Sequence, residues 1–302
     1  MQHFYANKKK KGILNIMKIK EIYKNKKTVI SFEIFPPKKD PDISSIYGAL
    51  SELSELSPDF ISVTYSAGGS KNSGKTFEIA SAIKHKYGIE SVAHLTCINS
   101  RRSEISDILK KAEEAGIENI LALRGDIPED FSGEPELHYA KELIAEIKHN
   151  HPSLCVGATA YPEGHIDCET MEQNVRYLKE KADAGAEFFI TQLFFDNRCF
   201  YEFYDKTLAY NLRIPISAGI MPIISKSQIE KMIFMCGASL PAAIIRILRK
   251  YEHSPEDLEK AAIEYSAAQI NDLIAHKVDG VHLYTMNRPE IARKNLERIK
   301  TW

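Results

Sequence analysis

The sequence predicts a single-domain (β/α)8 barrel, the α/β fold class also called the TIM barrel. From residue 28 onward, short runs rich in β-branched and aromatic residues alternate with longer amphipathic segments, as in repeated βα units around a parallel sheet. Eight such runs occur within about 270 residues, which fits this barrel in length and order. Polar side chains stand at the ends of the runs, where a barrel builds its site. An open doubly wound sheet would give the same alternation and is the alternative architecture.

Each predicted strand is a short apolar run that ends in polar or turn-forming residues. The eight strands are predicted at residues 28–34, 60–66, 91–97, 119–125, 154–161, 188–194, 214–220 and 281–286. The amphipathic segments between them predict helices, several of which end at a Gly. These helices are predicted at residues 42–56, 74–87, 101–115, 136–149, 169–184, 198–209, 225–236 and 289–300. Residues 239–275 predict two extra helices before the last strand, an insertion rather than a second domain.

The composition is that of a globular protein of a reducing compartment. The 302 residues are 44% hydrophobic and carry 40 basic and 41 acidic side chains, so no overall charge favours nucleic acid or membrane. Five cysteines are scattered without a C-x-x-C pair, which argues against a metal site or a disulfide framework and fits the cytoplasm. Residues 1–27 are predicted to be a basic, solvated tail or short helix, and residues 28–302 form the predicted barrel. The apolar runs before residue 28 are too short for a signal peptide or a membrane span.

Charged and polar side chains stand at the C-terminal ends of the predicted strands, where the βα loops of a barrel build its site. Unpaired charge is costly at the end of an apolar strand, so these residues indicate that something binds there. Ordinary polar loop residues are the alternative explanation. In chain order the residues are Glu33, Thr64, His94, Arg124, Asp126, Tyr161, Gln192, Asn287 and Arg288.

One loop matches the phosphate-binding pattern G-x-x-x-x-G-K-[ST]. The match is GSKNSGKT at residues 69–76, directly before a predicted helix, so a phosphate-loop nucleotide hydrolase is one hypothesis. Asp126, at the end of an apolar strand, would then bind Mg²⁺. However, residues 66–68 separate the loop from its strand, and any exposed βα loop is rich in Gly, Ser, Lys and Asn. The pattern therefore favours a hydrolase only weakly.

Seven motifs at the predicted strand ends together resemble 5,10-methylenetetrahydrofolate reductase. They are FEIFPP (32–37), ISVTYSAGG (61–69), HLTC (94–97), ALRGD (122–126), AYPEGH (160–165), DAGAEFFITQLFFD (183–196) and LYTMNR (283–288), in the order and at the spacing of that family. The resemblance covers the chain after residue 27 and is to the compact bacterial type, without the S-adenosylmethionine-sensing domain of eukaryotic members. It implies a barrel that binds FAD and, with NADH or NADPH as donor, reduces methylenetetrahydrofolate to 5-methyltetrahydrofolate for methionine synthesis.

The resemblance also implies roles for individual residues. Glu33 would be the general acid that protonates the departing ring nitrogen, and its apolar neighbours would favour its protonated form. Asp126 would favour the cationic iminium that forms when the ring opens. The implied FAD contacts are Thr64, His94, Arg124, Gly125, Asp126, Tyr139, Ala140, Tyr161, His165 and Lys181. The implied substrate contacts are Gln192, Gln228 and Arg288.

Three residues depart from the bacterial pattern. Glu180 stands where a basic flavin contact is common, and Asn174 and Tyr177 stand where Asp and Asn are common, so the affinity for FAD is in question. NADH, NADPH and a partner protein are all open as electron donor, because the chain has no dinucleotide-binding G-x-G-x-x-G. The resemblance implies a homo-oligomer. A barrel that binds flavin or folate only within a larger complex is a further alternative.

Overall fold

The computed structural model describes residues 17–37, 43–65, 73–127 and 133–299, and its strands form a closed parallel barrel. The strands pair in chain order, and β8 closes the ring against β1. They are β1 (Val29–Ile34), β2 (Phe60–Val63), β3 (Glu90–Thr96), β4 (Asn119–Leu123), β5 (Cys155–Ala160), β6 (Phe188–Thr191), β7 (Ile216–Ile220) and β8 (Gly280–Tyr284). The predicted (β/α)8 fold is confirmed, and the pairing of β8 with β1 excludes the open sheet.

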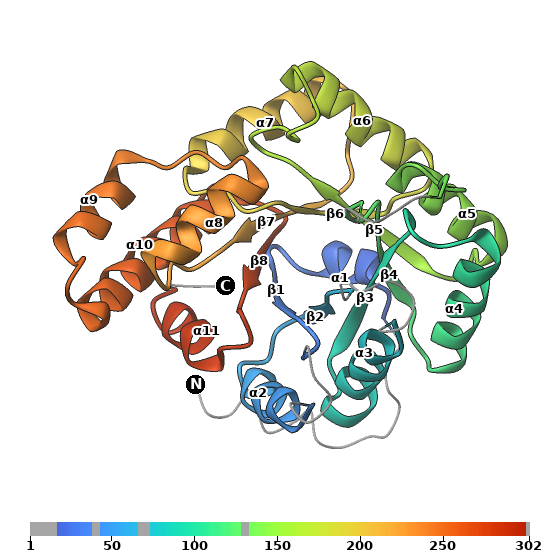
Figure 1. Cartoon of the computed structure of the whole chain (residues 1–302), viewed down its shortest axis with the longest axis horizontal. Coiled ribbons are helices and arrows are strands. Elements are labelled where there is room, and N and C mark those ends of the chain that lie inside the picture. The colour runs from blue at the N-terminus through green and yellow to red at the C-terminus, as the bar shows by residue number, and fades with distance from the viewer. Residues whose placement is uncertain (1–16, 38–42, 66–72, 128–132, 300–302) are drawn as a thin grey trace.

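Helices form an outer ring around the barrel, as Figure 1 shows. They are α2 (Ile43–Glu55), α3 (Ser73–Tyr87), α4 (Arg102–Glu114), α5 (Ala140–Asn150), α6 (Met171–Asp183), α7 (Asn197–Ala209), α8 (Lys226–Cys236), α9 (Ala242–Lys250), α10 (Pro255–Ala275) and α11 (Pro289–Leu296). The crossover from β7 to β8 contains α8, α9 and α10, so the two predicted extra helices before the last strand are present. No helix in the described part of the chain is long and apolar enough to cross a membrane.

Strand β6 is shorter than the apolar run that predicted it. The strand ends at Thr191, and the Oε1 atom of Gln192 accepts a hydrogen bond from the Leu193 N–H at 2.9 Å. Leu193 and Phe195 are buried in a separate apolar cluster with residues of α8, α9 and α10. The end of the run therefore reflects burial beneath the extra helices and not pairing in the sheet.

Helix α1 (Ile19–Asn25) covers the N-terminal mouth of the barrel. Ile19 is fully buried in a cluster that includes Phe60 and Phe188 from the beginnings of two strands. The Ile19 N–H donates a hydrogen bond to Oδ1 of Asn119 at 2.9 Å. A solvated tail or short helix was predicted for residues 1–27; a short helix is present, but it buries Ile19 and Ile22, a packing that the surrounding charge obscured. Residues 1–16 of the predicted tail lie outside the described residues.

The interior of the barrel changes from apolar to polar along its axis. Phe60 and Phe188 fill the N-terminal mouth together with α1. Residue 157 must be glycine, because a Cβ atom there would lie 2.3 Å from the ring of Phe188. Toward the other mouth, the side chains inside the barrel include Glu33 and His282. The barrel is thus sealed at one mouth, and its polar interior faces the other.

Candidate active site

The carboxylate of Glu33 lies inside the barrel, near the C-terminal end of β1. Its Oε2 atom lies 3.6 Å from Nε2 of His94 on β3 and 3.6 Å from Nε2 of His282 on β8. Ser62 on β2 directs its hydroxyl toward the same oxygen at 3.5 Å. Strands β2 and β8 flank β1 in the sheet. Polar groups from three other strands therefore converge on one carboxylate oxygen.

His94 is a neutral, unsatisfied group beside Glu33. Burial lowers the pKa of its imidazole to about 4, although the Glu33 carboxylate acts in the opposite direction. Its Nε2 atom is buried without a hydrogen-bond partner among the described residues. Buried polar atoms are rarely left unpaired unless they serve a function. The predicted site residue His94 is thus available to a ligand at the C-terminal mouth or to the Glu33 proton.

His282 is fully buried and was not among the predicted site residues. Its Nδ1 atom lies 2.7 Å from Oγ of Ser31, and its ring stacks on that of Phe60 with 6.0 Å between centroids. The sequence analysis considered strand ends, whereas His282 lies in the middle of β8. A signal was present, because His282 and Tyr284 alternate with apolar residues, which places both on the inner face of the strand.

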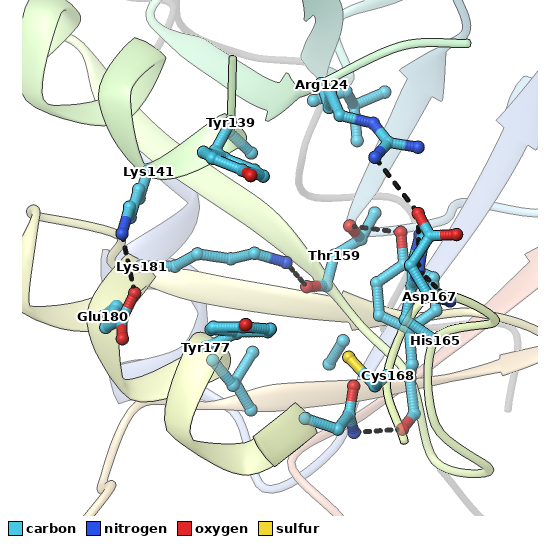
Figure 2. A pocket seen from close by; sticks show the side chains of 16 residues that line it. Arg124, Tyr139, Lys141, Thr159, His165, Asp167, Cys168, Tyr177, Glu180 and Lys181 are labelled. Carbon is cyan, nitrogen blue, oxygen red and sulfur yellow. Dashed lines mark hydrogen bonds and ion pairs between the residues drawn. The ribbon is translucent and has the colours of Figure 1, made fainter. Parts of the chain in front are cut away.

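A cavity of about 500 Å³ lies beside the ends of β4 and β5, against α5 and α6. This volume is within the range of small-molecule sites. In Figure 2, the rings of Tyr139 and Tyr177 lie on either side of the Lys181 side chain. The predicted cofactor contacts that line the cavity are Arg124, Tyr139, Ala140, Tyr161, His165 and Lys181. Four other predicted contacts, all described in the structure, do not line it; these are Thr64, His94, Gly125 and Asp126.

Lys181 brings a positive charge to the inner wall of this cavity. Its Nζ atom donates to the Thr159 carbonyl oxygen at 2.9 Å and lies 5.4 Å from the centroid of the Tyr161 ring. Burial lowers the pKa of the ammonium group to about 8. Within the described ranges, no carboxylate forms an ion pair with it. A partly buried cation without a paired carboxylate is costly, so this position is suited to an anionic ligand.

Arg124 and Asp167 form the rim of the cavity (Figure 2). Nη1 of Arg124 lies 3.2 Å from Oδ2 of Asp167. His165 accepts a hydrogen bond on Nδ1 from the Asp167 N–H at 3.1 Å, and burial lowers the pKa of its ring. Both charged side chains at the rim are partly exposed, so the pair is weak enough to rearrange for a ligand.

Asp126 is exposed at the end of β4 and is placed by the turn before it. Gly125 has φ of +85°, and a Cβ atom there would lie 2.9 Å from Cβ of Thr96. Only glycine fits both conditions, since positive φ strains other residues. Burial and, to a smaller extent, the Asp126 carboxylate raise the pKa of the Cys236 thiol at the end of α8.

The three departures from the bacterial pattern all lie on α6 at the wall of the cavity. Oε2 of Glu180 accepts a hydrogen bond from Nζ of Lys141 on α5 at 2.8 Å. Nδ2 of Asn174 donates to the carbonyl oxygen of Tyr161 at 2.8 Å. Tyr177 is 40% exposed and adds a ring to the lining. In this chain the wall therefore carries an ion pair and an aromatic ring at those positions.

The predicted substrate contacts Gln192 and Gln228 differ in the freedom of their side chains. The carbonyl group of Gln192 accepts from Leu193, and its amide nitrogen has no hydrogen-bond partner within the described part of the chain. Oε1 of Gln228 accepts from the Ile224 N–H at 2.7 Å, next to the start of α8. Gln228 thus stabilises its own loop, whereas Gln192 has donors to offer.

Arg288, the third predicted substrate contact, is held by two carboxylates. Its Nε atom donates to Oε1 of Glu290 at 2.7 Å, and its Nη2 atom lies 3.6 Å from Oε2 of Glu259. A substrate carboxylate would have to compete with both carboxylates for the Arg288 guanidinium group.

The phosphate-loop match at residues 69–76 has the wrong surroundings for a nucleotide hydrolase. Residues 69–72 of the match lie outside the described residues. Thr76 is fully buried, and its hydroxyl donates to the Thr64 carbonyl oxygen at 3.0 Å. A phosphate loop uses this hydroxyl to bind Mg²⁺. The arrangement argues against the hydrolase hypothesis.

Similarity to known proteins extends over almost the whole chain. The methylenetetrahydrofolate reductase family matches residues 18–300. The chain belongs to this family. It is 32% identical over 263 residues to the 5,10-methylenetetrahydrofolate reductase of Escherichia coli, a match that covers 87% of this chain and 88% of that protein. The predicted methylenetetrahydrofolate reductase resemblance is confirmed.

The chain is also similar to part of a longer relative and, in its fold, to a solved structure. It is 32% identical over 278 residues to methylenetetrahydrofolate reductase 1 of Schizosaccharomyces pombe, covering 90% of this chain and 46% of that protein, so it spans about half of that relative. A solved structure from Clostridium thermocellum has a TM-score of 0.64 at 16% identity, covering 93% of this chain and 97% of that one. That protein binds two copies of 5-methyl-5,6,7,8-tetrahydrofolic acid, and the likeness at this identity shows the fold.

Proposed function

We propose that the chain is an FAD-dependent reductase that converts 5,10-methylenetetrahydrofolate to 5-methyltetrahydrofolate with NADH or NADPH as donor. The observation that carries the proposal is the Glu33 carboxyl group, held inside the C-terminal half of the barrel beside His94, His282 and Ser62. Membership of the methylenetetrahydrofolate reductase family supports it. An Arabidopsis thaliana relative, 31% identical, is named methylenetetrahydrofolate reductase (NADH) 1, which supports a nicotinamide donor.

Glu33 would act as the general acid of the folate reaction. The five-membered ring of the substrate opens when the departing nitrogen receives a proton, and Glu33 would donate that proton. The carbon–nitrogen bond breaks with its electron pair going to nitrogen, which leaves a cationic iminium. The Asp126 carboxylate at the open mouth would stabilise this cation, and the free amide of Gln192 would bind the pterin.

The positive charges and aromatic rings of the cavity support FAD as its ligand. Lys181 and Arg124 would bind the diphosphate, because both offer donors to charged oxygens. Tyr139 and Tyr177 would pack against a ring of the cofactor. When bound, FAD would supply a carrier of hydride between the nicotinamide donor and the folate.

The test has two stages. The absorption spectrum of the supernatant from heat-denatured protein identifies a bound flavin, and we expect FAD. Anaerobic stopped-flow then follows flavin bleaching by NADH or NADPH, and flavin reoxidation by methylenetetrahydrofolate. A protein that binds no flavin, or a reduced flavin that methylenetetrahydrofolate leaves reduced, would refute the proposal. Bleaching by dithionite but by neither nucleotide would indicate a partner protein as the donor.

The proposal extends to the state of the protein in the cell. All five cysteines are free, which supports a reducing compartment such as the cytoplasm. The family resemblance supports a homo-oligomer. Light scattering on the purified protein tests the assembly, and a monomeric mass would contradict it.

A further inference from the structure

We propose that Thr191 and Tyr284 are positioning residues that hold the amide group of Gln192 in place for the pterin ring of the folate. The proposal rests on the function proposed above, in which Gln192 binds the pterin, and it concerns two side chains that act through Gln192. Thr191 is the last residue of β6, directly before Gln192, and Tyr284 is the last residue of β8.

The hydrogen bonds between β6 and β7 end earlier than the register of the two strands requires. The Phe189 N–H donates to the Pro215 carbonyl oxygen at 2.8 Å, and in this parallel register the Gly219 N–H would meet the Thr191 carbonyl oxygen farther along the strands. The Gly219 N–H instead donates to Oγ1 of Thr191 at 2.8 Å. The side chain of Thr191 thus replaces its own carbonyl oxygen as the acceptor.

Tyr284 binds the carbonyl oxygen that this exchange releases. Its phenol donates to the Thr191 carbonyl oxygen at 2.6 Å. The phenol reaches β6 from β8 although β7 lies between the two strands. A Cβ atom at Gly219 would lie 2.3 Å from the Thr191 carbonyl oxygen and 2.9 Å from Cε2 of Tyr284. The bond between Tyr284 and Thr191 therefore depends on glycine at position 219.

The chain beyond β6 is also held by hydrogen bonds from neighbouring elements. The Gln192 N–H donates to the carbonyl oxygen at the end of β5 at 2.7 Å, so only the β7 side of the strand is released. Farther along, Gln269 on α10 donates to the Phe194 carbonyl oxygen at 3.1 Å, and Tyr265 on the same helix donates to the Phe195 carbonyl oxygen at 2.6 Å. Gln192 is therefore fixed from β5, from β8 and from the extra helix α10.

This arrangement engages one half of the Gln192 amide group and leaves the other half for a ligand. The Oε1 atom accepts from the Leu193 N–H at 2.9 Å, and Nε2 has no hydrogen-bond partner within the described residues. The amide N–H groups can donate to the acceptor atoms of a pterin ring. Without the Tyr284 phenol, the Thr191 carbonyl oxygen would pair with the Gly219 N–H, and Gln192 would turn toward β7.

Tyr284→Phe tests the proposal, because it removes the phenol hydroxyl and keeps the ring. The flavin is reduced with stoichiometric dithionite, so no nicotinamide donor is present. Its reoxidation by methylenetetrahydrofolate is then followed anaerobically over a range of folate concentrations. We expect the apparent Kd of the folate to rise about tenfold, while the limiting rate changes by less than about threefold, because the acid Glu33 is retained.

Gln192→Leu shows whether Tyr284 acts through Gln192. In the Gln192→Leu background, Tyr284→Phe should raise the apparent Kd of the folate no further. A second tenfold rise would mean that Tyr284 acts independently of Gln192, and an unchanged Kd in the single variant Tyr284→Phe would mean that its bond has no role; either result would overturn the proposal. Wild-type protein whose reduced flavin does not react with methylenetetrahydrofolate would instead refute the proposed function.

A second pair of variants leaves Tyr284 intact and decides the question if Tyr284→Phe fails to fold. Thr191→Val keeps the shape of a fully buried side chain but removes the acceptor of the Gly219 N–H, which should then pair with the carbonyl oxygen and displace Tyr284. Thr191→Ser retains the hydroxyl. We expect the apparent Kd of the folate to rise about tenfold in the valine variant and to stay close to the wild-type value in the serine variant. Equal Kd values in the two variants would contradict the proposal.

Tyr23→Phe is the matched control at the opposite mouth of the barrel. It also removes a phenol hydroxyl, one that lies 2.7 Å from Oγ of Ser217. The apparent Kd of the folate and the limiting rate should both stay at their wild-type values. A rise in the Kd as large as that in Tyr284→Phe would show that any lost phenol hydroxyl in the barrel disturbs the site, and would overturn the specific role of Tyr284.

Discussion

Polar groups described at the two mouths of the barrel differ in whether the chain itself provides their hydrogen-bond partners. At the N-terminal mouth, α1 is hydrogen-bonded to the barrel, because the Ile19 N–H donates to Oδ1 of Asn119. At the C-terminal mouth Nε2 of His94 has no hydrogen-bond partner, and Lys181 has no paired carboxylate in the described part of the chain. The chain itself thus pairs the start of α1, whereas His94 and Lys181 are groups that a ligand would satisfy.

This difference separates the parts of the protein that contribute to stability from those that contribute to chemistry. Unpaired buried groups reduce the free energy of unfolding, so the unpaired Nε2 atom of His94 inside the barrel indicates a functional demand there. The apolar cluster of Ile19, Phe60 and Phe188 at the other mouth offsets part of that loss of stability. Substitutions at the open mouth should therefore change ligand binding or rate, and substitutions at the sealed mouth should change stability.

Glu33→Gln should give the largest effect at the open mouth. The amide keeps the shape of the side chain but cannot act as the acid, so flavin reoxidation by methylenetetrahydrofolate should slow by about 10²- to 10⁴-fold. Flavin reduction by NADH and the melting temperature should not fall. Glu114→Gln, at an exposed position on α4, is the control and should alter neither half-reaction. Equal slowing of both half-reactions would remove Glu33 from the role of acid.

Ile19→Ala should give the largest effect at the sealed mouth. The fully buried side chain would leave a cavity between α1 and the strands, which costs about 2–5 kcal/mol of unfolding free energy. Urea titration measures this loss. Ile245→Ala removes a partly exposed isoleucine from α9 and should cost much less, within about 1 kcal/mol. If Ile19→Ala also slowed folate reduction by folded protein, stability and chemistry would not be separable between the mouths.

The sequence was more informative about the open mouth than about the sealed one. Glu33 was predicted because functional groups of a barrel occur near strand ends and because the motif around it resembles a known family, whereas Lys181, on α6, was predicted from the family resemblance alone. The role of α1 could not be predicted, because it depends on contacts of Ile19 with residues about a hundred positions away, such as Asn119. No local pattern in a basic heptapeptide encodes such a partner.

His282 and β6 show two further limits of reading patterns along the chain. His282 lies in the middle of a strand, and its position beside Ser31 and Glu33 depends on the pairing of β8 with β1. Leu193 lies in the segment predicted as strand, but it packs with residues of α8, α9 and α10 beyond the end of β6. Apolar runs predict burial well, whereas the partner that causes burial is set by the closed topology.

Lys181→Met tests the unpaired cation at the open mouth. Loss of a charge-assisted hydrogen bond should raise the Kd of FAD by about 10- to 100-fold in fluorescence titrations. Because the pKa of Lys181 is about 8, wild-type affinity should fall as the pH rises through that value and the ammonium group is lost. FAD binding above that pH should take up a proton, which calorimetry in two buffers detects.

The Lys181→Met variant should lose this pH dependence of its affinity for FAD. Lys179→Met is the control, because Lys179 on the same helix pairs with Asp183 and does not line the cavity. It should leave both the Kd and its pH dependence unchanged. A pH-independent affinity in the wild type would mean that Lys181 does not meet the anionic part of the cofactor.

Glu180→Gln should give the smallest effect and acts in the opposite direction. The Glu180 carboxylate lies at the cavity wall, where it is paired with Lys141 and repels an incoming diphosphate. Neutralising it frees the Lys141 charge, but both side chains are partly exposed, so FAD should bind only a few-fold more tightly. The gain should shrink at high salt, because exposed charges are screened. Glu172 is on the same helix as Glu180 but away from the cavity, and it pairs with Lys206 of α7; Glu172→Gln should change nothing. Weaker binding by Glu180→Gln would show that the ion pair between Glu180 and Lys141 mainly holds α5 against α6. The wall of the open mouth would then contribute to stability, as the contacts at the sealed mouth do.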